Sequence, residues 1–213
     1  MKIFDLTHTI KNGSPAWPGE SPPVLEKKYT HDKDGYQVIK LQVLTHSGTH
    51  LDTPAHFFNT GQTTDILPLE HFFGKGCIVD CRNFGKGEEI PASHLLHFHE
   101  KIKASDFVLI WTGWGEFWET NQYFDHFPVL STDAVRFLVS CNIKGIGLDV
   151  GSIDAIDSED YPNHNQVLGK KIIVIENLAG IGQLEKREFY FSAFPLKISE
   201  GDGSPVRAAG VVF

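Results

Sequence analysis

The chain has 213 residues, and at the usual ~150 residues per domain this length predicts one domain that spans residues 1–213. Hydrophobic residues make up 41% of the chain and charged residues 22%. These proportions exclude a disordered or fibrous protein and allow a sizeable core. Nineteen basic residues against 27 acidic residues give a formal charge of -8, so the chain lacks the basic surface that nucleic acids require.

The apolar stretches are too short to cross a membrane. Phe107–Trp111 and Ile172–Ile175 are typical of them, whereas a spanning helix needs ~20 residues. The N-terminal segment Met1–Asp5 has an acidic residue at its fifth position and contains no apolar core of a signal peptide. An odd number of cysteines favours reduced thiols over a disulfide framework; they are Cys77, Cys81 and Cys141. Together these features predict a cytoplasmic protein with no membrane partner.

Extended segments dominate the chain, because runs rich in Ile, Val, Leu and Phe recur between turn residues. Val24–Thr30 and Tyr36–Thr45 flank the polar turn His31–Gly35 and predict a β-hairpin. Further strands are expected at Ile3–Leu6, Cys77–Asp80, Phe107–Thr112, Gly145–Asp149, Lys171–Glu176 and Tyr190–Lys197.

Helical patterns are fewer. Ser131 or Thr132 can cap a helix whose apolar residues within Ala134–Val139 recur at three- and four-residue spacing. A second helix is expected over Ala92–Lys101, and a single turn over Leu69–Phe72. Strands that outnumber the helices and partly alternate with them predict an α/β fold, with strand-rich mixed sheets and a few covering helices.

Candidate metal ligands gather between residues 46 and 56, a segment that reads H-S-G-T-H-L-D-T-P-A-H. His46, His50, Asp52 and His56 all occupy even positions, so in an extended chain they project from one face. A straight strand would separate the first from the last by about 33 Å, which is too far for one metal ion. The segment must therefore bend.

Gly48 and Pro54 are the expected bending points, because glycine accepts unusual backbone angles and proline restricts the chain around it. Imidazole and carboxylate ligands suit zinc, manganese or iron(II). The absence of a nearby thiolate favours an open catalytic site over a closed structural zinc site. The alternative is that these side chains only hydrogen-bond to a loop backbone, but four candidates on one face favour a metal site.

The same segment resembles the H-x-G-T-H-x-D-x-P-x-H signature of the cyclase family, which includes bacterial kynurenine formamidases and isatin hydrolase-like enzymes. The similarity extends over nearly the whole chain. The resemblance implies a swivelling β/β/α domain that assembles as a homodimer or homotetramer. The other matching segments are Trp17–Glu20, Trp111–Trp114, Asn163–His164, Ile175–Leu178 and Asp202–Ala208.

The resemblance also implies a set of metal ligands. His46, His50 and Asp52 would bind one divalent ion. His164 and Glu176 would complete a second site that shares Asp52, with Glu176 as a bridging ligand. The resemblance therefore predicts one or two divalent ions, with zinc as the first choice and manganese as the second.

His56 would be the proton donor and acceptor, and Trp17 would line the substrate pocket. A histidine of near-neutral pKa can take a proton from water and return it to an amine leaving group, while a divalent ion polarises the carbonyl. Two positions differ from the family pattern. Glu20 stands in place of the usual aspartate, and Asn177 follows Glu176 where kynurenine formamidases tend to carry glycine.

The resemblance thus implies a metal-dependent hydrolase of the linear C–N bond in a small aromatic amide, first of all N-formylkynurenine, which would give kynurenine and formate. An isatin-type cyclic amide, or cyclisation or dehydration of another carbonyl compound, is the alternative. A third hypothesis is a non-catalytic metal- or ligand-binding module. Asp149 stays outside the catalytic set, because an aspartate at a strand end is at least as often a turn former.

Overall fold

A nine-stranded sheet runs through the computed structural model, which describes residues 1–213. The strand order is β1-β13-β11-β5-β7-β9-β10-β4-β12. Strands β5, β7, β9 and β10 are parallel, and the strands on both flanks are antiparallel. The sheet strands are β1 (Lys2–Asp5), β4 (His50–Asp52), β5 (Phe73–Asp80), β7 (Phe107–Trp111), β9 (Gly145–Leu148), β10 (Ile173–Glu176), β11 (Phe189–Ser192), β12 (Gly203–Pro205) and β13 (Ala209–Val212).

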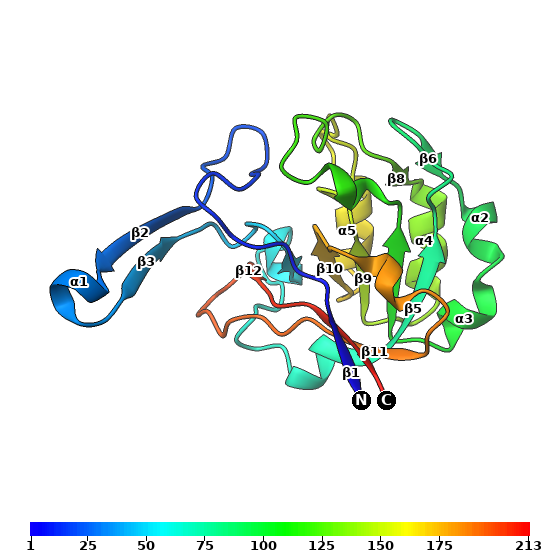
Figure 1. The fold of residues 1–213 in the computed structure, drawn as a ribbon. Helices are drawn as coiled ribbons and strands as arrows, with labels where there is room; N and C mark the ends of the chain where they lie inside the picture. The colour runs from blue at the N-terminus through cyan, green and yellow to red at the C-terminus, as the bar shows by residue number, and fades with distance from the viewer.

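Short helices cover the sheet, and two small ribbons complete the fold (Figure 1). No helix combines the length and the hydropathy that a membrane crossing requires. The ribbons pair β2 (Val24–Tyr29) with β3 (Val38–Gln42), and β6 (Glu89–Ile90) with β8 (Val129–Leu130). The helices are α1 (His31–Asp34), α2 (Ala92–Leu96), α3 (His99–Lys103), α4 (Thr132–Ser140) and α5 (Pro162–Leu168), with 3-10 turns η1 (Pro54–His56), η2 (Leu69–Phe72), η3 (Trp114–Phe117) and η4 (Ile181–Leu184).

Successive side chains of the central strands are buried alternately on the two faces of the sheet. On β7, Val108 and Ile110 belong to the core beneath the helices, whereas Phe107 and Leu109 belong to a second core on the opposite face. Successive side chains of a strand point to opposite faces, so an uninterrupted apolar strand must be buried on both. All four residues are fully buried. The core therefore lies on both sides of the parallel centre.

The predicted fold class is confirmed, since the molecule is a mixed α/β fold with a strand-rich sheet and few helices. The predicted strands all form, with bounds that differ by a few residues. The predicted helix cap is also present, because the Ser131 side chain accepts a hydrogen bond from the Ala134 backbone N–H. The predicted turn Leu69–Phe72 is η2.

Three predicted elements differ in detail. The helix expected over Ala92–Lys101 is split into α2 and α3, because Phe98 leaves the helical backbone region with φ -106 and ψ 7. The strand expected to run to Lys197 ends at Ser192, ahead of Pro195, whose ring nitrogen has no hydrogen to donate to a ladder. The polar hairpin turn of residues 31–35 forms the helical turn α1.

Some elements gave no signal in the sequence. Strands β4 and β12 have three residues each, which is too short for a period of two to show. Helix α5 begins with Pro162 and continues with mostly polar side chains, so it lacks an apolar stripe at helical spacing. These elements nevertheless carry or border the predicted ligands.

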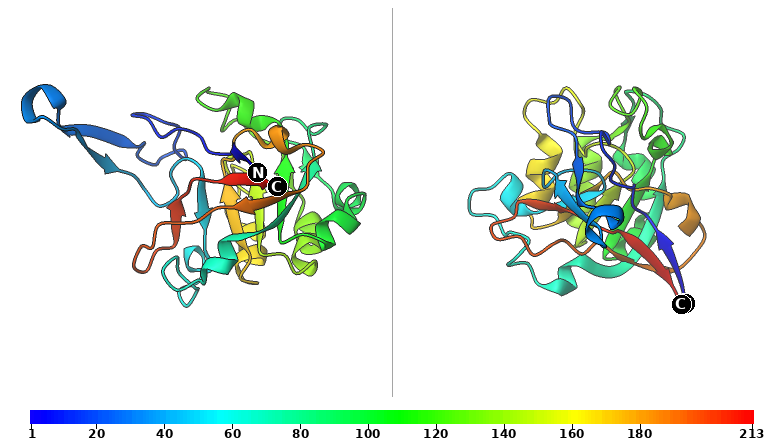
Figure 2. Two further views of the ribbon diagram at one scale, coloured as in Figure 1. Left: turned by 60° about the horizontal axis from the view of Figure 1, so that its bottom comes forward. Right: turned by 60° about the vertical axis from the view of Figure 1, so that its left-hand side comes forward.

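Strands β2 and β3, with helix α1 at their tip, form an arm that projects from the body of the molecule in Figure 1 and in the left-hand view of Figure 2. The arm leaves the body close to β4 and β12, at the far edge of the sheet from β1 (Figure 1). Both chain termini lie together at the opposite edge, where β1 pairs with β13.

Candidate metal centre

Strand β4 places His50 and Asp52 in the middle of the candidate site. It pairs with β10 on one side and with β12 on the other, so His50 lies opposite Glu176, and Asp52 lies opposite Gly203. A Cβ atom at Gly203 would come within 2.6 Å of the His46 ring. Glycine at this position therefore lets the imidazole of His46 lie against the sheet edge.

The chain bends on both sides of β4, as the sequence predicted. Gly48 has φ +65, a left-handed conformation that glycine adopts without strain. Pro54 begins the 3-10 turn η1, which ends at His56. These bends bring His46 and His56 together, with their rings stacked at a centroid distance of 3.9 Å.

Helix α5 brings His164 to the same place from a distant part of the chain. Its Nε2 atom lies 3.5 Å from Asp52 Oδ2 and 3.4 Å from Glu176 Oε1. His50 Nε2 approaches the same two carboxylates, at 3.3 Å from Asp52 Oδ1 and 3.5 Å from Glu176 Oε2. All four side chains are buried. Two imidazoles and two carboxylates therefore face one another in the interior.

The predicted ligands fall into two overlapping groups. His50, Asp52 and Glu176 have ligand atoms within 4.8 Å of one another, and so do His46, Asp52 and His56. Asp52 belongs to both groups, as expected for a shared ligand. Glu176 lies in the group that contains His50, a position open to the bridging role that the resemblance implies.

The two buried histidines each have one ring nitrogen held by an oxygen acceptor. His50 Nδ1 lies 2.8 Å from the Gly48 carbonyl, and His164 Nδ1 lies 2.7 Å from Asp154 Oδ2. Because these oxygens accept, Nδ1 of each ring carries the proton. Nε2 of each ring faces the carboxylates and is the atom left to coordinate an ion, the arrangement that metal-binding histidines require.

His46 is bound through both ring nitrogens. Nδ1 lies 2.7 Å from Asp52 Oδ1, and Nε2 lies 2.9 Å from Asp202 Oδ2. Asp202 also lies 3.4 Å from His56 Nδ1. In this arrangement His46 is an imidazolium between two carboxylates, and it would have to release one of them to coordinate an ion.

The electrostatics of the cluster favour positive charge. Burial opposes protonation of His46, but Asp52 and Asp202 outweigh it and raise the pKa of the imidazole to about 10. Burial also opposes protonation of His164, yet Asp154, Asp52 and Glu176 hold its pKa well above the ordinary value. Protons on these rings thus balance the buried carboxylates, and a cation would balance them equally well.

Asp52 gives a direct test of whether an ion fits. Its Oδ2 atom is buried and has no hydrogen-bond partner, an arrangement that costs free energy unless a cation or donor compensates it. The surrounding nitrogen and oxygen atoms are ligands that zinc and manganese accept. The donor set therefore fits a divalent ion.

A cavity of about 510 Å³ opens above the cluster, and Trp17 lines it together with His46, His56 and Glu176. Three further aromatic residues that the sequence did not single out also line it, namely Phe57, Phe124 and Tyr161. Phe57 stacks on His164 at 4.8 Å, and Trp17 meets Phe124 edge to face at 5.7 Å. The cavity thus combines charged groups at its floor with several aromatic side chains in its wall.

Sequence reasoning missed the residues that orient the predicted ligands. Asp154 lies in a loop without a recognisable motif, so nothing in the sequence marked it. Asp202 begins the segment Asp202–Ala208, which matched the family pattern but carried no assigned role. Asp149 was left outside the catalytic set, and its buried carboxylate accepts hydrogen bonds from the Thr112 hydroxyl and from the backbone N–H of Thr112 and Gly113.

Asn177, one of the two departures from the family pattern, supports the loop at Gly48. It has φ 56, a conformation that asparagine tolerates better than most residues. Its amide donates to the Gly48 carbonyl at 2.9 Å, and its Oδ1 accepts from the Tyr123 hydroxyl at 2.6 Å. The Gly48 carbonyl that orients His50 is therefore itself held in place by a buried side chain.

The fold and this cluster define a metal-dependent hydrolase-like protein, and comparison with known proteins gives its family. A family model described as "Putative cyclase" matches residues 4–155, and the chain belongs to this family. It is 31% identical to a kynurenine formamidase of Bacillus cereus over 206 residues, which cover 96% of this chain and 95% of that protein. The match to the kynurenine formamidase of Bacillus anthracis is also 31% identical, over 208 residues, 97% of this chain and 96% of that protein.

Solved structures of similar fold include isatin hydrolase A from Labrenzia aggregata. Its TM-score to this chain is 0.89 with 26% identity, over 99% of this chain and 93% of that one. A structure described as a potential metal-dependent hydrolase with cyclase activity has a TM-score of 0.80 with 25% identity, over 98% of this chain and 96% of that one. The predicted family resemblance is confirmed.

Proposed function

We propose that residues 1–213 act as one domain that hydrolyses the C–N bond of a small aromatic amide with the help of a divalent metal ion. N-formylkynurenine is the leading substrate, with kynurenine and formate as products. The observation that carries the proposal is the cluster of His50, Asp52, His164 and Glu176 at the floor of a cavity, in which the buried Oδ2 atom of Asp52 has no hydrogen-bond partner.

The ion would be held by His50, Asp52, His164 and Glu176, and His46 would join them after releasing one carboxylate. Zinc is our first choice and manganese the second, because both accept imidazole and carboxylate ligands. A bound divalent ion supplies charge that polarises the amide carbonyl and acidifies a water molecule. One or two ions are compatible with two ligand groups that share Asp52.

His56 is the proposed proton carrier. It lies in the cavity wall, and its Nδ1 atom faces Asp202 Oδ2 at 3.4 Å. Nε2 forms no hydrogen bond within the protein, so this atom can take a proton from water and donate it to the leaving amine. Burial, together with the nearby His46 and His164, lowers the pKa of His56 despite the opposing carboxylates. The neutral base is therefore the form present at neutral pH.

The aromatic walls support a planar substrate. Trp17, Phe57, Phe124 and Tyr161 line the cavity, and ring faces of this kind bind flat aromatic groups by stacking and edge contacts. Kynurenine formamidase is the name borne by relatives that cover almost the full chain. An aniline-type ring against these walls would leave its formamide group above the carboxylate floor.

Isatin is the second candidate substrate. The structural match to isatin hydrolase A, with a TM-score of 0.89 at 26% identity, favours it. Both reactions cleave an amide bond by addition of water. The two candidates differ in the group that leaves, because the amine formed from isatin stays attached to the product.

A substrate panel tests the proposal. Metal-loaded protein is incubated with N-formylkynurenine and, separately, with isatin, and products are identified by mass spectrometry. Release of formate from N-formylkynurenine supports the leading substrate, and ring opening of isatin alone supports the second. A product that has lost water would show a cyclase or dehydratase. No turnover in either assay, together with a stoichiometric bound metal, would support a non-catalytic module and refute the proposal.

The proposal includes the setting of the enzyme. We propose that the protein assembles as a homodimer or homotetramer. We also propose that it acts in the cytoplasm, because all three cysteines are free and buried, as suits a reducing compartment. Elemental analysis of the purified protein identifies the metal. Iron or magnesium in stoichiometric amount would overturn the choice of zinc or manganese.

A further inference from the structure

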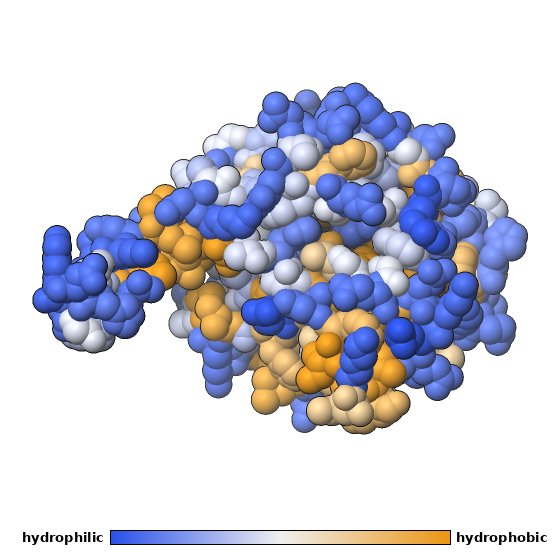
Figure 3. Space-filling model, in the orientation of Figure 1, coloured by the Kyte–Doolittle hydropathy of each residue, from blue (hydrophilic) through white to orange (hydrophobic).

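Tyr123 carries a hydroxyl group into the apolar interior. Its side chain is fully buried and belongs to the core beneath the helices, whereas polar residues cover much of the visible surface of the body (Figure 3). Burial of a hydroxyl costs free energy unless a hydrogen bond compensates it. The Tyr123 hydroxyl has such a bond, because it donates to Asn177 Oδ1 at 2.6 Å. The reason for a tyrosine at this position therefore lies in its contact with Asn177.

Chemistry fixes the direction of each hydrogen bond that Asn177 makes. The Gly48 carbonyl can only accept, so the Asn177 atom that faces it at 2.9 Å is the NH2 nitrogen. The amide oxygen then faces Tyr123, whose hydroxyl is the donor. Burial, together with Asp149 and Glu176, raises the pKa of Tyr123 well above its ordinary value, so the hydroxyl keeps its proton. The Asn177 amide therefore has one orientation that satisfies both neighbours.

The Gly48 carbonyl accepts a second hydrogen bond, from a proposed metal ligand. His50 Nδ1 lies 2.8 Å from this oxygen, and a carbonyl oxygen has two lone pairs that can receive both donors. The donor nitrogens of His50 and Asn177 lie 3.3 Å apart. The position of the carbonyl therefore sets the rotation of the His50 ring, and with it the direction of Nε2 toward Asp52 and Glu176.

The peptide of Gly48 depends on contacts from outside its own segment. Gly48 has φ +65, and glycine has more conformational freedom to lose on folding than any other residue. Asn177 restrains this peptide from the end of β10, although the two residues are 129 positions apart in the chain. A side chain from a central strand thus restrains the turn that carries His50.

Every polar group of Asn177 is in use. Its backbone N–H donates to the Val150 carbonyl at 3.0 Å, and its own carbonyl accepts from the Thr49 hydroxyl at 2.6 Å. The side chain makes the two bonds to Gly48 and Tyr123, and the whole residue is buried. Without the Tyr123 hydroxyl, Oδ1 of the amide would be left unpaired, and the amide would be free to turn away from Gly48.

Packing holds Tyr123 firmly in place. Its backbone carbonyl accepts from the Trp114 indole N–H at 2.8 Å. Its ring meets Trp118 and Phe124 edge to face, with centroid distances of 4.9 and 5.1 Å. The hydroxyl is therefore a fixed point to which the Asn177 amide is tied.

We propose that Tyr123 is a positioning residue for the candidate metal centre. Through the Asn177 amide and the Gly48 carbonyl, its hydroxyl holds the ring of His50 in the orientation that directs Nε2 at the carboxylates. The role of His50 as a ligand rests on the proposed function, whereas the orientation of its ring does not. Contacts that orient a ligand without touching the ion change metal affinity by about 10- to 100-fold.

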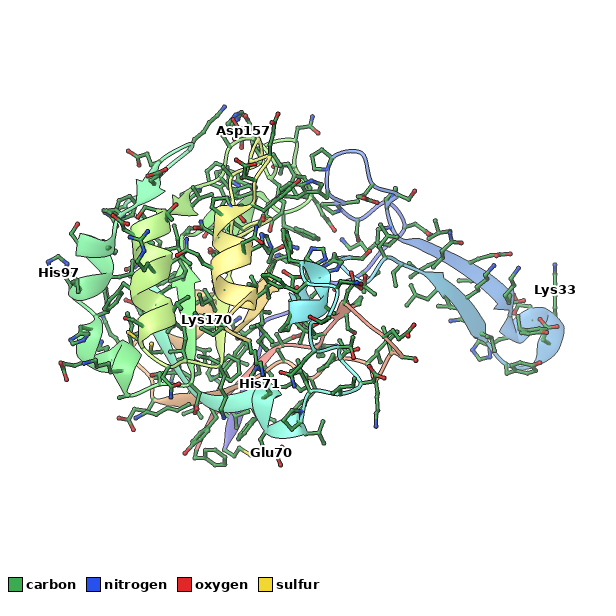
Figure 4. The ribbon with its side chains drawn as sticks, turned by 180° about the vertical axis from the view of Figure 1, so that it is seen from behind. Lys33, Glu70, His71, His97, Asp157 and Lys170 are labelled. Atoms are coloured by element: carbon green, nitrogen blue, oxygen red, sulfur yellow. The ribbon has the colours of Figure 1, made fainter.

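Tyr123→Phe removes the hydroxyl and keeps the packed ring. We expect the affinity of the full-length protein for zinc to fall by about 10-fold, as measured by competition with a chromophoric chelator. Val135→Ala is the matched control. Val135 is fully buried in the same core as Tyr123, but it lies on α4, the helix that packs beside α5 (Figure 4). This control should lower the melting temperature and leave the zinc affinity at the wild-type value.

Asn177→Gly tests whether Tyr123 acts through the amide. Glycine accepts the φ of 56 at this position, so the backbone keeps its course while the amide is lost. Zinc affinity should fall, and addition of Tyr123→Phe to this variant should cause no further loss, because the hydroxyl then has nothing to act through. An equal loss from Tyr123→Phe in the wild type and in the Asn177→Gly variant would overturn the proposal.

Nuclear magnetic resonance of the metal-free protein tests the orientation of His50 directly. Its buried Nδ1 proton should give a slowly exchanging signal in the wild type and in Val135→Ala, identified by its absence from His50→Asn. In Tyr123→Phe this proton should exchange too fast to observe.

An unchanged signal in Tyr123→Phe, or the same loss of signal in Val135→Ala, would overturn the proposal. A wild type that bound no zinc and hydrolysed no amide would refute the proposed function, and the resonance of metal-free His50 would still decide the role of Tyr123. The two failures are therefore distinguishable.

Discussion

The carboxylate of Asp154 accepts a hydrogen bond from His164 Nδ1 at 2.7 Å, and this contact determines which nitrogen of His164 faces the candidate metal site. The same carboxylate accepts from the backbone N–H groups of Asn163 and His164 at 2.8 and 3.0 Å. Asp154 therefore holds both the first turn of α5 and the ring that α5 carries.

Asp154→Asn should weaken metal binding without removing a ligand. The amide can present its NH2 group to His164 Nδ1, which would move the ring proton to Nε2 and block coordination there. We expect a loss of about 10- to 100-fold in affinity, measured by competition with a chromophoric chelator. Asp157→Asn is the control, because Asp157 is exposed on the same loop. Equal affinities in Asp154→Asn and the wild type would contradict the assigned role.

His56→Ala separates proton transfer from metal binding. We expect kcat to fall by about 10²- to 10⁴-fold while the metal content measured by elemental analysis stays at the wild-type level. His97→Ala serves as the control, because His97 is exposed outside the cavity. A parallel loss of bound metal would instead make His56 a ligand, in the group that it forms with His46 and Asp52.

Removal of the metal should lower the melting temperature of the wild type. A ligand present at 100 times its Kd stabilises the folded state by about 2.7 kcal/mol, and a chelator abolishes that contribution. Asp52→Asn should show no such response, because Asp52 belongs to both ligand groups. Calorimetry with and without chelator makes the comparison. A chelator shift of equal size in Asp52→Asn would place the ion elsewhere.

His8 should make stability depend on pH. Its ring stacks on Trp118 at 4.3 Å, and burial lowers its pKa from the ordinary 6.5 to about 4, although Glu119 opposes the shift. The unfolded chain therefore binds this proton first, and the contribution of His8 to stability is complete above pH 6.5 and is lost as the pH falls toward 4.

His8→Phe keeps the stacked ring and removes the titrating group. Urea unfolding at several pH values between about 4 and 7 should show a smaller loss of stability on acidification in this variant than in the wild type. Parallel curves for the two proteins would mean that His8 does not titrate in this range.

Local sequence patterns were sufficient to predict those strands and helices whose own residues show an apolar run or a capping residue. The apolar runs around Phe107–Trp111 and Ile173–Glu176 predicted buried strands, and Ser131 predicted the start of α4. These predictions succeed because side-chain burial and capping depend on neighbours within a few residues. The bends at Gly48 and Pro54 were predicted for the same reason.

The family signature extended the prediction to distant residues. His164 and Glu176 entered the ligand set through resemblance, and the structure places both beside Asp52. Their roles as ligands stay predictions until a metal is measured. Asp154 and Asp202 carried no local signal, because what matters in them is their distance to a histidine from another part of the chain.

By itself, the sequence determined the α/β class, most strand positions, and a histidine-rich segment with two bending points. Only the tertiary structure decided that β4 lies between β10 and β12, that α5 delivers His164 to Asp52, and that the arm stands free of the body. The physical reason is that strand register and helix docking depend on packing between segments far apart in the chain. Local propensity and spacing contain no information about that packing.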